Sequence, residues 1–178
     1  MKDLKQFNIQ FVGLKLGKHS FEYQIDNTFF GLFDYDEFSE ASIKIDLEFV
    51  KKTTFFELVF HANGFVTVPC DVTNELYDQE IENTLPLLVK FGLEFNNEDE
   101  EILTLPHGDY ELNVAQFIYE MIVLSVPLKR VHPKVEDGTM ESEALKKLKE
   151  LEIKENKTVA NTDPRWDKLK NLITEKKT

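Results

Sequence analysis

The sequence has almost no cysteine and no long apolar run. Cys70 is the only cysteine among 178 residues, which excludes an intramolecular disulfide and favours a reducing compartment. No stretch approaches the roughly 18–20 consecutive apolar residues of a membrane span, and no apolar run follows Met1. We therefore expect a cytoplasmic protein with neither a signal peptide nor a membrane partner.

The signatures of common catalytic and metal sites are also missing. There is no Gly-x-Ser-x-Gly elbow, no Walker loop and no Gly-x-Gly-x-x-Gly run. The four histidines are too scattered to place two of them on one helix face: they are His19, His61, His107 and His132. The acidic runs at 34–40 and 98–101 lack the glycine and spacing of an EF-hand loop. Cys70 is in phase with Val66 and Val68, which indicates a buried strand residue rather than a nucleophile. We expect no catalytic residue, no metal and no cofactor.

Charge of one sign dominates most of the chain. Residues 1–128 carry eight Lys/Arg against 23 Asp/Glu, a net charge of −15, whereas residues 129–178 carry 13 against 10, a net charge of +3. So acidic a body repels phosphate and favours basic partners. DNA is therefore not an expected partner, although the basic tail could still contact an RNA phosphate.

The first two-thirds of the chain alternates apolar and polar residues as β-strands do. Period-two runs predict strands near residues 7–16, 21–25, 43–49, 56–62, 66–72 and 85–95. Asn63-Gly64 predicts a tight hairpin turn between two of these runs. Pro86 falls out of phase, which indicates an edge position or a bulge. Residues 27–40 have no clean period and are expected to form a loop with a helical turn.

Two helices are predicted after these strands. The first covers residues 113–126, with Asn113 as cap, Gln116 as the capping-box partner and Pro127 as the stop. The second covers residues 142–153 and carries leucines at intervals of three. The expected fold class is α+β: an antiparallel sheet, open or barrel-like, packed against one apolar helix and followed by a helical tail. We expect an acidic core domain at 1–133 and a basic tail at 134–178, with a linker near 154–162.

The closing residues 163–172 form the most informative segment. Asp163-Pro164 caps and starts a helix, and it is followed by an apolar stripe beside basic residues, made of Trp166, Leu169, Leu172 and Ile173. The candidate partner-binding residues are Arg165, Trp166, Lys168, Leu169, Lys170 and Leu172. Trp166 is the only tryptophan, so the stripe either docks on the protein's own domain or anchors a partner.

Three ordered segments resemble the YceD-like large ribosomal RNA accumulation proteins. Residues 120–127, with Val131-His132 after them, resemble the family's Glu-x-x-x-Leu-x-x-Pro signature. Residues 64–70 are similar to its Gly-x-x-x-x-x-Cys strand, and residues 163–166 to its Asp-Pro-Arg closing motif. Many relatives have a second cysteine just after the first, where this chain has Val72-Thr73. A metal role seen in such relatives is therefore not carried over.

The resemblance implies a factor needed for accumulation of large-subunit rRNA. We expect a non-enzymatic protein whose partner is the large ribosomal subunit or its precursor, contacted through a ribosomal protein or through rRNA. Two alternatives stay open. One is a general adaptor whose acidic body binds basic clients, and the other is direct binding of single-stranded RNA by the basic tail, with a steep salt dependence.

Overall fold

One five-stranded sheet forms the frame of the protein. The computed structural model describes residues 4–99 and 101–151, and the chain divides into two units, up to Met140 and from Glu141. In the first unit the strands lie in the order β2-β3-β4-β5-β6. Their bounds are β2 Gly17–Asp26, β3 Glu40–Lys51, β4 Phe55–Pro69, β5 Leu76–Gly92 and β6 Ile102–Pro106. The predicted α+β class, rich in strands, is confirmed.

Shorter elements complete this unit. A small second sheet pairs β1 (Asn8–Ile9) with β7 (Leu112–Asn113). Helix α1 spans Asn27–Phe30, α2 spans Ala115–Ser125 and α3 spans Pro133–Glu136, while single 3-10 turns occupy Leu4–Phe7, Phe11–Gly13 and Gly31–Phe33. The second unit contains α4, Glu143–Leu151, within the predicted second helix.

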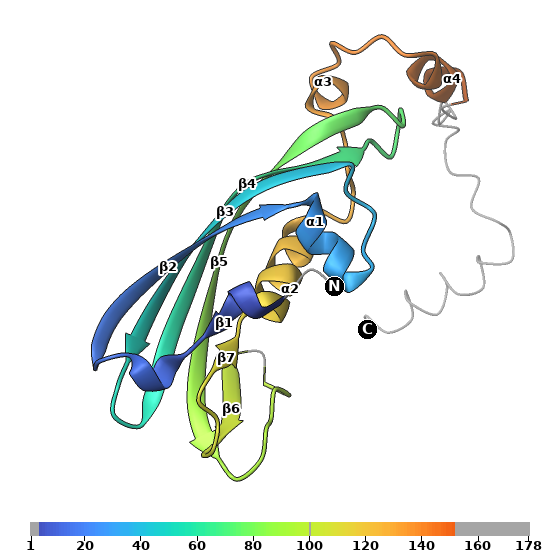
Figure 1. Ribbon diagram of the computed structural model, residues 1–178. Coiled ribbons are helices and arrows are strands. Elements are labelled where there is room, and N and C mark those ends of the chain that lie inside the picture. Colours follow the sequence, from blue (N-terminus) through green and yellow to red (C-terminus); the bar gives the residue numbers. More distant parts are fainter. Residues whose placement is uncertain (1–3, 100, 152–178) are drawn as a thin grey trace, which may run out of the picture. The chain divides into compact units, whose positions relative to one another are not determined.

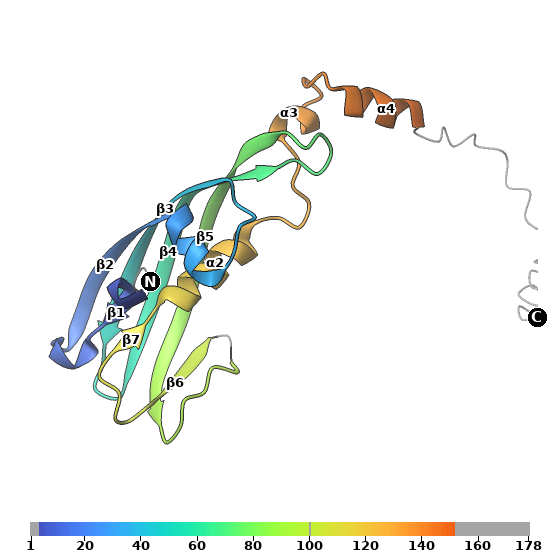
Figure 2. The ribbon, with the colours of Figure 1, turned by 45° about the vertical axis from the view of Figure 1, so that its right-hand side comes forward.

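The apolar face of the sheet and helix α2 make the core. Alternate residues of the paired strands point to one face, as the period of two requires. Those buried on this inner face are Ile43, Ile45, Leu47 and Phe49 of β3, Phe56, Leu58, Phe60, Ala62, Val66 and Val68 of β4, and Ile81, Leu87 and Val89 of β5. Figures 1 and 2 show α2 lying against one face of this sheet. Its residues Ala115, Ile118, Met121 and Ile122 are buried there.

The predicted hairpin at Asn63-Gly64 is wrong, because β4 runs through it without a break. Gly64 pairs with Ile43 of β3 and Ile81 of β5 in an uninterrupted register. A Cβ at Gly64 would overlap the backbone oxygen of Ser42. The glycine is therefore needed for the close approach of two strands rather than for a turn.

The expected all-antiparallel arrangement also needs correction. β6 pairs with β5 in parallel, from Leu88 opposite Ile102 to Gly92 opposite Pro106, so the sheet is mixed. The sheet stays open, with β2 and β6 as its end strands, so it forms no barrel. Pro86 precedes the part of β5 that pairs with β6, so it lies where β5 is bonded only to β4 among the described residues. This agrees with the predicted edge position.

The N-terminal segment is less regular than predicted. In place of a strand over residues 7–16, two 3-10 turns flank the short strand β1. Phe7, Ile9 and Phe11 are nevertheless all buried. Their spacing thus reports correctly which side chains enter the core, but not the backbone conformation that puts them there. The loop with a helical turn predicted at 27–40 is confirmed by α1 and the 3-10 turn after it.

Helix α2 begins and ends close to the predicted residues, but with a simpler cap. The backbone N–H of Ala115 donates to the Asn113 side-chain oxygen at 3.0 Å. The capping box is not formed, because the Gln116 amide instead donates to Glu120 Oε1 at 2.8 Å, one turn along the helix. The helix ends at Ser125, two residues before Pro127.

We predict that Gly64→Ala lowers the free energy of unfolding by about 1–3 kcal/mol, since the added Cβ would force β3 and β4 apart. Urea denaturation followed by circular dichroism measures the change. Gly31→Ala is the matched control, because no heavy atom lies within 4 Å of a Cβ there and its φ is −62°. The control should change stability by less than about 1 kcal/mol. Equal stability of the two variants would contradict the close approach at Gly64.

Candidate functional site

The partner-binding residues predicted from the sequence lie outside the described part of the chain. These are Arg165, Trp166, Lys168, Leu169, Lys170 and Leu172. The structure therefore neither brings them together nor separates them. The residues on which the family resemblance depends are better placed, because two of its three segments lie within the described ranges.

Those two segments meet at the end of β4. Cys70 follows the last residue of β4, and the segment after Pro127 returns to it as an extended chain. The His132 backbone N–H donates to Cys70 Sγ at 3.3 Å, and the Asp71 N–H donates to the Arg130 backbone oxygen at 2.8 Å. The Gly-x-x-x-x-x-Cys strand and the Val131-His132 segment are thus hydrogen-bonded partners in the fold.

Side chains reinforce this junction. The Asp71 carboxylate accepts the Arg130 backbone N–H at 2.7 Å and lies 3.6 Å from Arg130 Nε. The same guanidinium lies 3.5 Å from a Glu37 oxygen. The Tyr77 ring, which is buried, lies 5.4 Å from the His132 ring, centroid to centroid. Together these contacts attach the chain that follows α2 to the sheet.

Cys70 serves this junction as an acceptor. Its side chain is only 2% exposed. Burial on its own would raise the pKa of the Cys70 thiol, but hydrogen bonds from the Thr73 hydroxyl and from the backbone N–H groups of His132, Val72 and Thr73 lower the pKa below its ordinary value. The His132 ring nitrogen Nδ1 accepts the Lys134 N–H at 3.0 Å, within its own turn. The contacts of Cys70 are those of a structural anchor.

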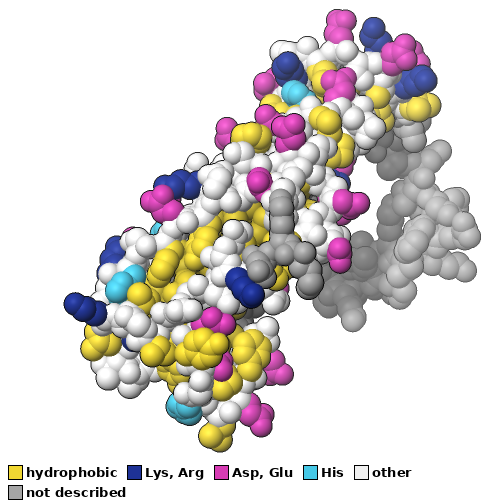
Figure 3. All heavy atoms as spheres, in the orientation of Figure 1, with side chains coloured by type: hydrophobic (Ala, Val, Ile, Leu, Met, Phe, Trp, Pro, Cys, Tyr) yellow, Lys and Arg dark blue, Asp and Glu magenta, His cyan; other side chains and the backbone are white. Residues whose placement is uncertain are grey.

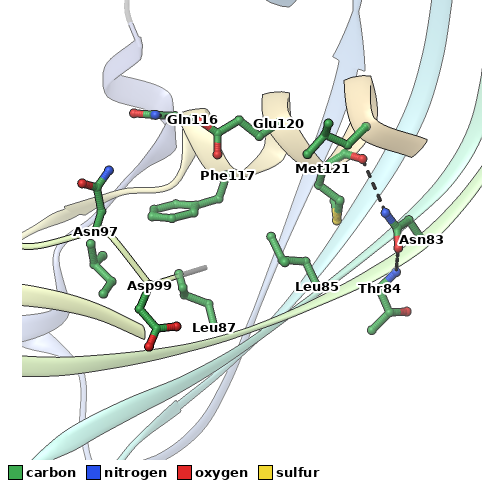
Figure 4. Close-up of a pocket in the computed structure, with 12 residues that line it drawn as sticks. Asn83, Thr84, Leu85, Leu87, Asn97, Asp99, Gln116, Phe117, Glu120 and Met121 are labelled. Carbon is green, nitrogen blue, oxygen red and sulfur yellow. Dashed lines mark hydrogen bonds between the residues drawn. The ribbon is translucent and has the colours of Figure 1, made fainter. Parts of the chain in front are cut away.

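A second feature, which the sequence did not predict, is a groove along one flank of α2. It lies between that helix and strands β5 and β6, and Asn97 and Asp99, which precede β6, line one end of it (Figure 4). One part has a volume of about 380 Å³ and the adjoining part about 290 Å³. Leu103, Gln116, Phe117 and Asn97 line both parts, which makes them one continuous surface. We call this surface the α2 groove.

The floor of the α2 groove is apolar. Figure 4 shows Phe117 and Met121 of α2 facing Leu85 and Leu87 of β5 across it. Leu103, Leu105 and Leu112 continue the floor into the second part. A concave, largely apolar surface with a few polar side chains is typical of a binding site.

The rim of the α2 groove carries charge of one sign. Asp99 and Glu120 line the first part, Asp109 and Glu111 line the second, and no Lys or Arg is among the described residues that line either. Figure 3 shows hydrophobic and acidic side chains gathered at the end of this face that holds β6 and β7. The groove is thus apolar inside and acidic outside.

Two sequence signals could have indicated this groove. Leu124 is in phase with the apolar residues of α2 but is 82% exposed, so the apolar stripe is wider than the face that the sheet covers. Residues 81–128 also carry one lysine against nine Asp/Glu. Neither signal states which strand lies opposite the helix.

The described residues hold neither a metal-binding cluster nor a membrane-spanning helix. Within residues 4–99 and 101–151, no three His, Cys, Asp or Glu side chains lie close enough to share a metal ion. In the same ranges no helix combines the length and apolarity that crossing a membrane requires.

We predict that Asp71→Ala lowers the free energy of unfolding by about 1 kcal/mol, because it removes the acceptor of the Arg130 backbone N–H. Asp71→Asn should lose less, since an amide oxygen still accepts that bond. Asp36→Ala, at another exposed acid, controls for the general effect of removing a negative charge. Thermal and urea unfolding measure all three. If Asp71→Ala were as stable as Asp36→Ala, the contacts of the Asp71 carboxylate with Arg130 would contribute nothing to the fold.

Comparisons with known proteins agree with the motifs that meet at Cys70. The family model described as "Large ribosomal RNA subunit accumulation protein YceD" matches residues 58–173. No curated protein and no solved structure matches this chain. The match covers β4 from Leu58 onward, β5, α2 and the returning segment, and so includes both halves of the junction. The resemblance inferred from the sequence is confirmed: this chain belongs to the YceD family of large ribosomal RNA subunit accumulation proteins.

Proposed function

We propose that the protein is a non-enzymatic cytoplasmic factor that supports assembly of the large ribosomal subunit. It would do so by binding a ribosomal protein or rRNA of the subunit or its precursor. Family membership links the chain to accumulation of large-subunit rRNA. The proposal adds the mode of action, which is binding rather than catalysis.

The observation that supports binding to a basic partner is an acidic patch on the outer face of the sheet. Asp78, Glu80 and Glu82 alternate along β5, and Glu40 of β3 lies in register with Asp78 through Thr67 of β4. All four acids are exposed. Several outer-face acids elsewhere on the sheet are instead within 4 Å of a lysine: Glu22 and Asp46 of Lys44, Glu48 of Lys18 and Glu57 of Lys52. The patch thus presents negative charge that favours a basic surface and repels phosphate.

Contact with rRNA would therefore fall to the basic C-terminal part. Arg165, Lys168 and Lys170 are candidates for phosphate contacts, and Trp166 with Leu169 and Leu172 for an apolar anchor. Aromatic and Arg side chains dominate binding hot spots, which is why Trp166 and Arg165 come first among these.

A general adaptor for basic clients is the second candidate function. The acidic patch favours it equally, because charge complementarity steers association without identifying the partner. Co-migration with ribosomal particles is the observation that separates the two candidates.

We predict that the tagged protein migrates with free or immature large subunits in a sucrose gradient of gently lysed cells, at low and at moderate salt. Trp166→Ala should move most of it to the top of the gradient, since the variant loses its apolar anchor. Leu128→Ala, which also removes an exposed apolar side chain, should migrate like the native protein.

Two results would count against this prediction. Native protein that stays at the top of the gradient under all conditions would refute stable binding to the particle. Trp166→Ala that loses thermal stability as well as migration would show that Trp166 stabilises the protein itself. The melting temperature of each variant is therefore measured beside its gradient.

A further inference from the structure

We propose that the α2 groove binds a lysine- and arginine-rich protein segment whose apolar side chains enter between α2 and β5–β6. The inference rests on the proposed function, and it names the surface and the chemistry of the protein partner. The family description does not mention this groove, although Glu120 and Leu124, which line it, belong to the Glu-x-x-x-Leu-x-x-Pro signature.

The first argument is the shape of the groove. Leu85 and Leu87 form an apolar floor facing Phe117 and Met121 (Figure 4), and Leu103 also lines the groove. Together the two parts enclose several hundred Å³, which is the range of sites that take up side chains or small molecules. Burial of apolar side chains there would supply most of the affinity.

The second argument is that apolar side chains continue beyond the floor. Leu124 lines one part of the groove and is 82% exposed, and Phe95 lines the other and is 58% exposed. Exposed apolar residues in line with an apolar groove mark an interaction surface. An elongated ligand such as a peptide segment fits a surface of this kind.

The third argument is charge complementarity. The rim acids Asp99, Glu120, Asp109 and Glu111 come from three separate stretches of chain, which the fold brings to one groove. The single lysine of residues 81–128 is Lys90, which is paired with Phe55 in β4 and is exposed on the opposite face of the sheet. Ammonium and guanidinium groups flanking the ligand's apolar side chains would meet carboxylates on both sides.

The groove is also held open in advance. The Asn83 amide of β5 donates to Ser125 Oγ at 2.7 Å and lies 3.5 Å from the Met121 backbone oxygen, so it links the C-terminal turn of α2 to the sheet. Since Asn83 lines the groove, this link fixes its width at that end. A preformed site does not have to be ordered when the ligand binds, which favours affinity.

RNA is the disfavoured ligand of this groove. Its phosphates would approach four carboxylates with no cation beside them among the described lining residues. A protein segment has both the apolar and the cationic side chains that the groove complements.

The test uses the full chain and a fluorescein-labelled peptide built only of Leu and Lys, with binding measured by fluorescence anisotropy. Three labelled ligands serve for comparison with this peptide: a Leu/Glu peptide, a Ser/Lys peptide and a single-stranded RNA. We expect the Leu/Lys peptide to bind at least about tenfold more tightly than the other three, because it alone has both properties.

Matched variants locate the binding surface. The Asp99→Lys/Glu120→Lys double variant should weaken Leu/Lys peptide binding about tenfold. Its control, Asp36→Lys/Glu75→Lys, makes the same change of charge at two exposed acids that neither line the groove nor belong to the acidic patch, and it should have little effect. Leu124→Ser should weaken binding about fivefold to tenfold. Its control, Leu128→Ser, changes a fully exposed leucine that does not line the groove.

Four results would overturn the proposal. The first is an equal loss of Leu/Lys peptide affinity in the test and control variants, and the second is tight RNA binding that the groove variants weaken. The third is equal affinity for the Ser/Lys and Leu/Lys peptides. The fourth is a shift in the fluorescence emission of Trp166 when Leu124→Ser is measured without peptide. The last would show that the chain's own C-terminal residues occupy the groove, since Trp166 is the only tryptophan.

The gradient separates this inference from the proposed function. If the groove variants still migrate with large subunits while peptide binding never depends on the groove, the inference fails and the proposed function stands. If the native protein never migrates with particles but the groove binds the basic peptide, the inference stands for a client outside the ribosome.

Discussion

The fit of one short helix to a long apolar sheet face is the constraint on which this structure depends. β4 has 15 residues and α2 has 11, so the strand is about 50 Å long and the helix about 16 Å. α2 therefore covers only part of the face that the alternating strands make apolar. The remaining apolar surface must be covered by other elements or left open to a ligand.

The two flanks of α2 resolve this constraint differently. On one flank, aromatic side chains from α1 and the turn after it fill the space, and Phe33 stacks on Tyr119 of α2 at 4.4 Å between ring centroids. On the other flank the space is the α2 groove, with Phe117 facing β5. The junction of Cys70, Asp71 and Arg130 then ties the chain beyond the helix to the sheet. The strand, helix and returning segment that the family match covers thus form one packing arrangement.

Much of this arrangement follows from the sequence, because burial on one face imposes a period that can be read directly. The alternation from Ile43 to Phe49 predicted β3, and the apolar stripe from Val114 to Ile122 predicted α2. The hairpin predicted at Asn63-Gly64 does not form, although the dipeptide favours a turn locally, because Ala62 and Val66 lie on the same face, as an unbroken strand requires. The unbroken alternation of apolar residues along β4 indicates the continuous strand better than the Asn-Gly dipeptide indicates a turn.

What could not be predicted depends on contacts between distant residues. The parallel pairing of β6 with β5 is set by how the 93–101 segment returns, which no local pattern specifies. The α2 groove requires Asn83 to meet Ser125, 42 residues away. The candidate anchor around Trp166 remains a prediction, since residues 163–172 lie outside the described part of the chain.

Photo-crosslinking from position 124 in living cells tests the central claim most directly, with position 128 as the reference. A benzophenone amino acid at each position reports what touches the α2 groove and what touches an exposed site outside it. Our account predicts that position 124, and not 128, crosslinks to a Lys/Arg-rich segment of a large-subunit protein, identified by mass spectrometry. Crosslinks from position 124 only to rRNA, or only to the chain's own C-terminal residues, would contradict it.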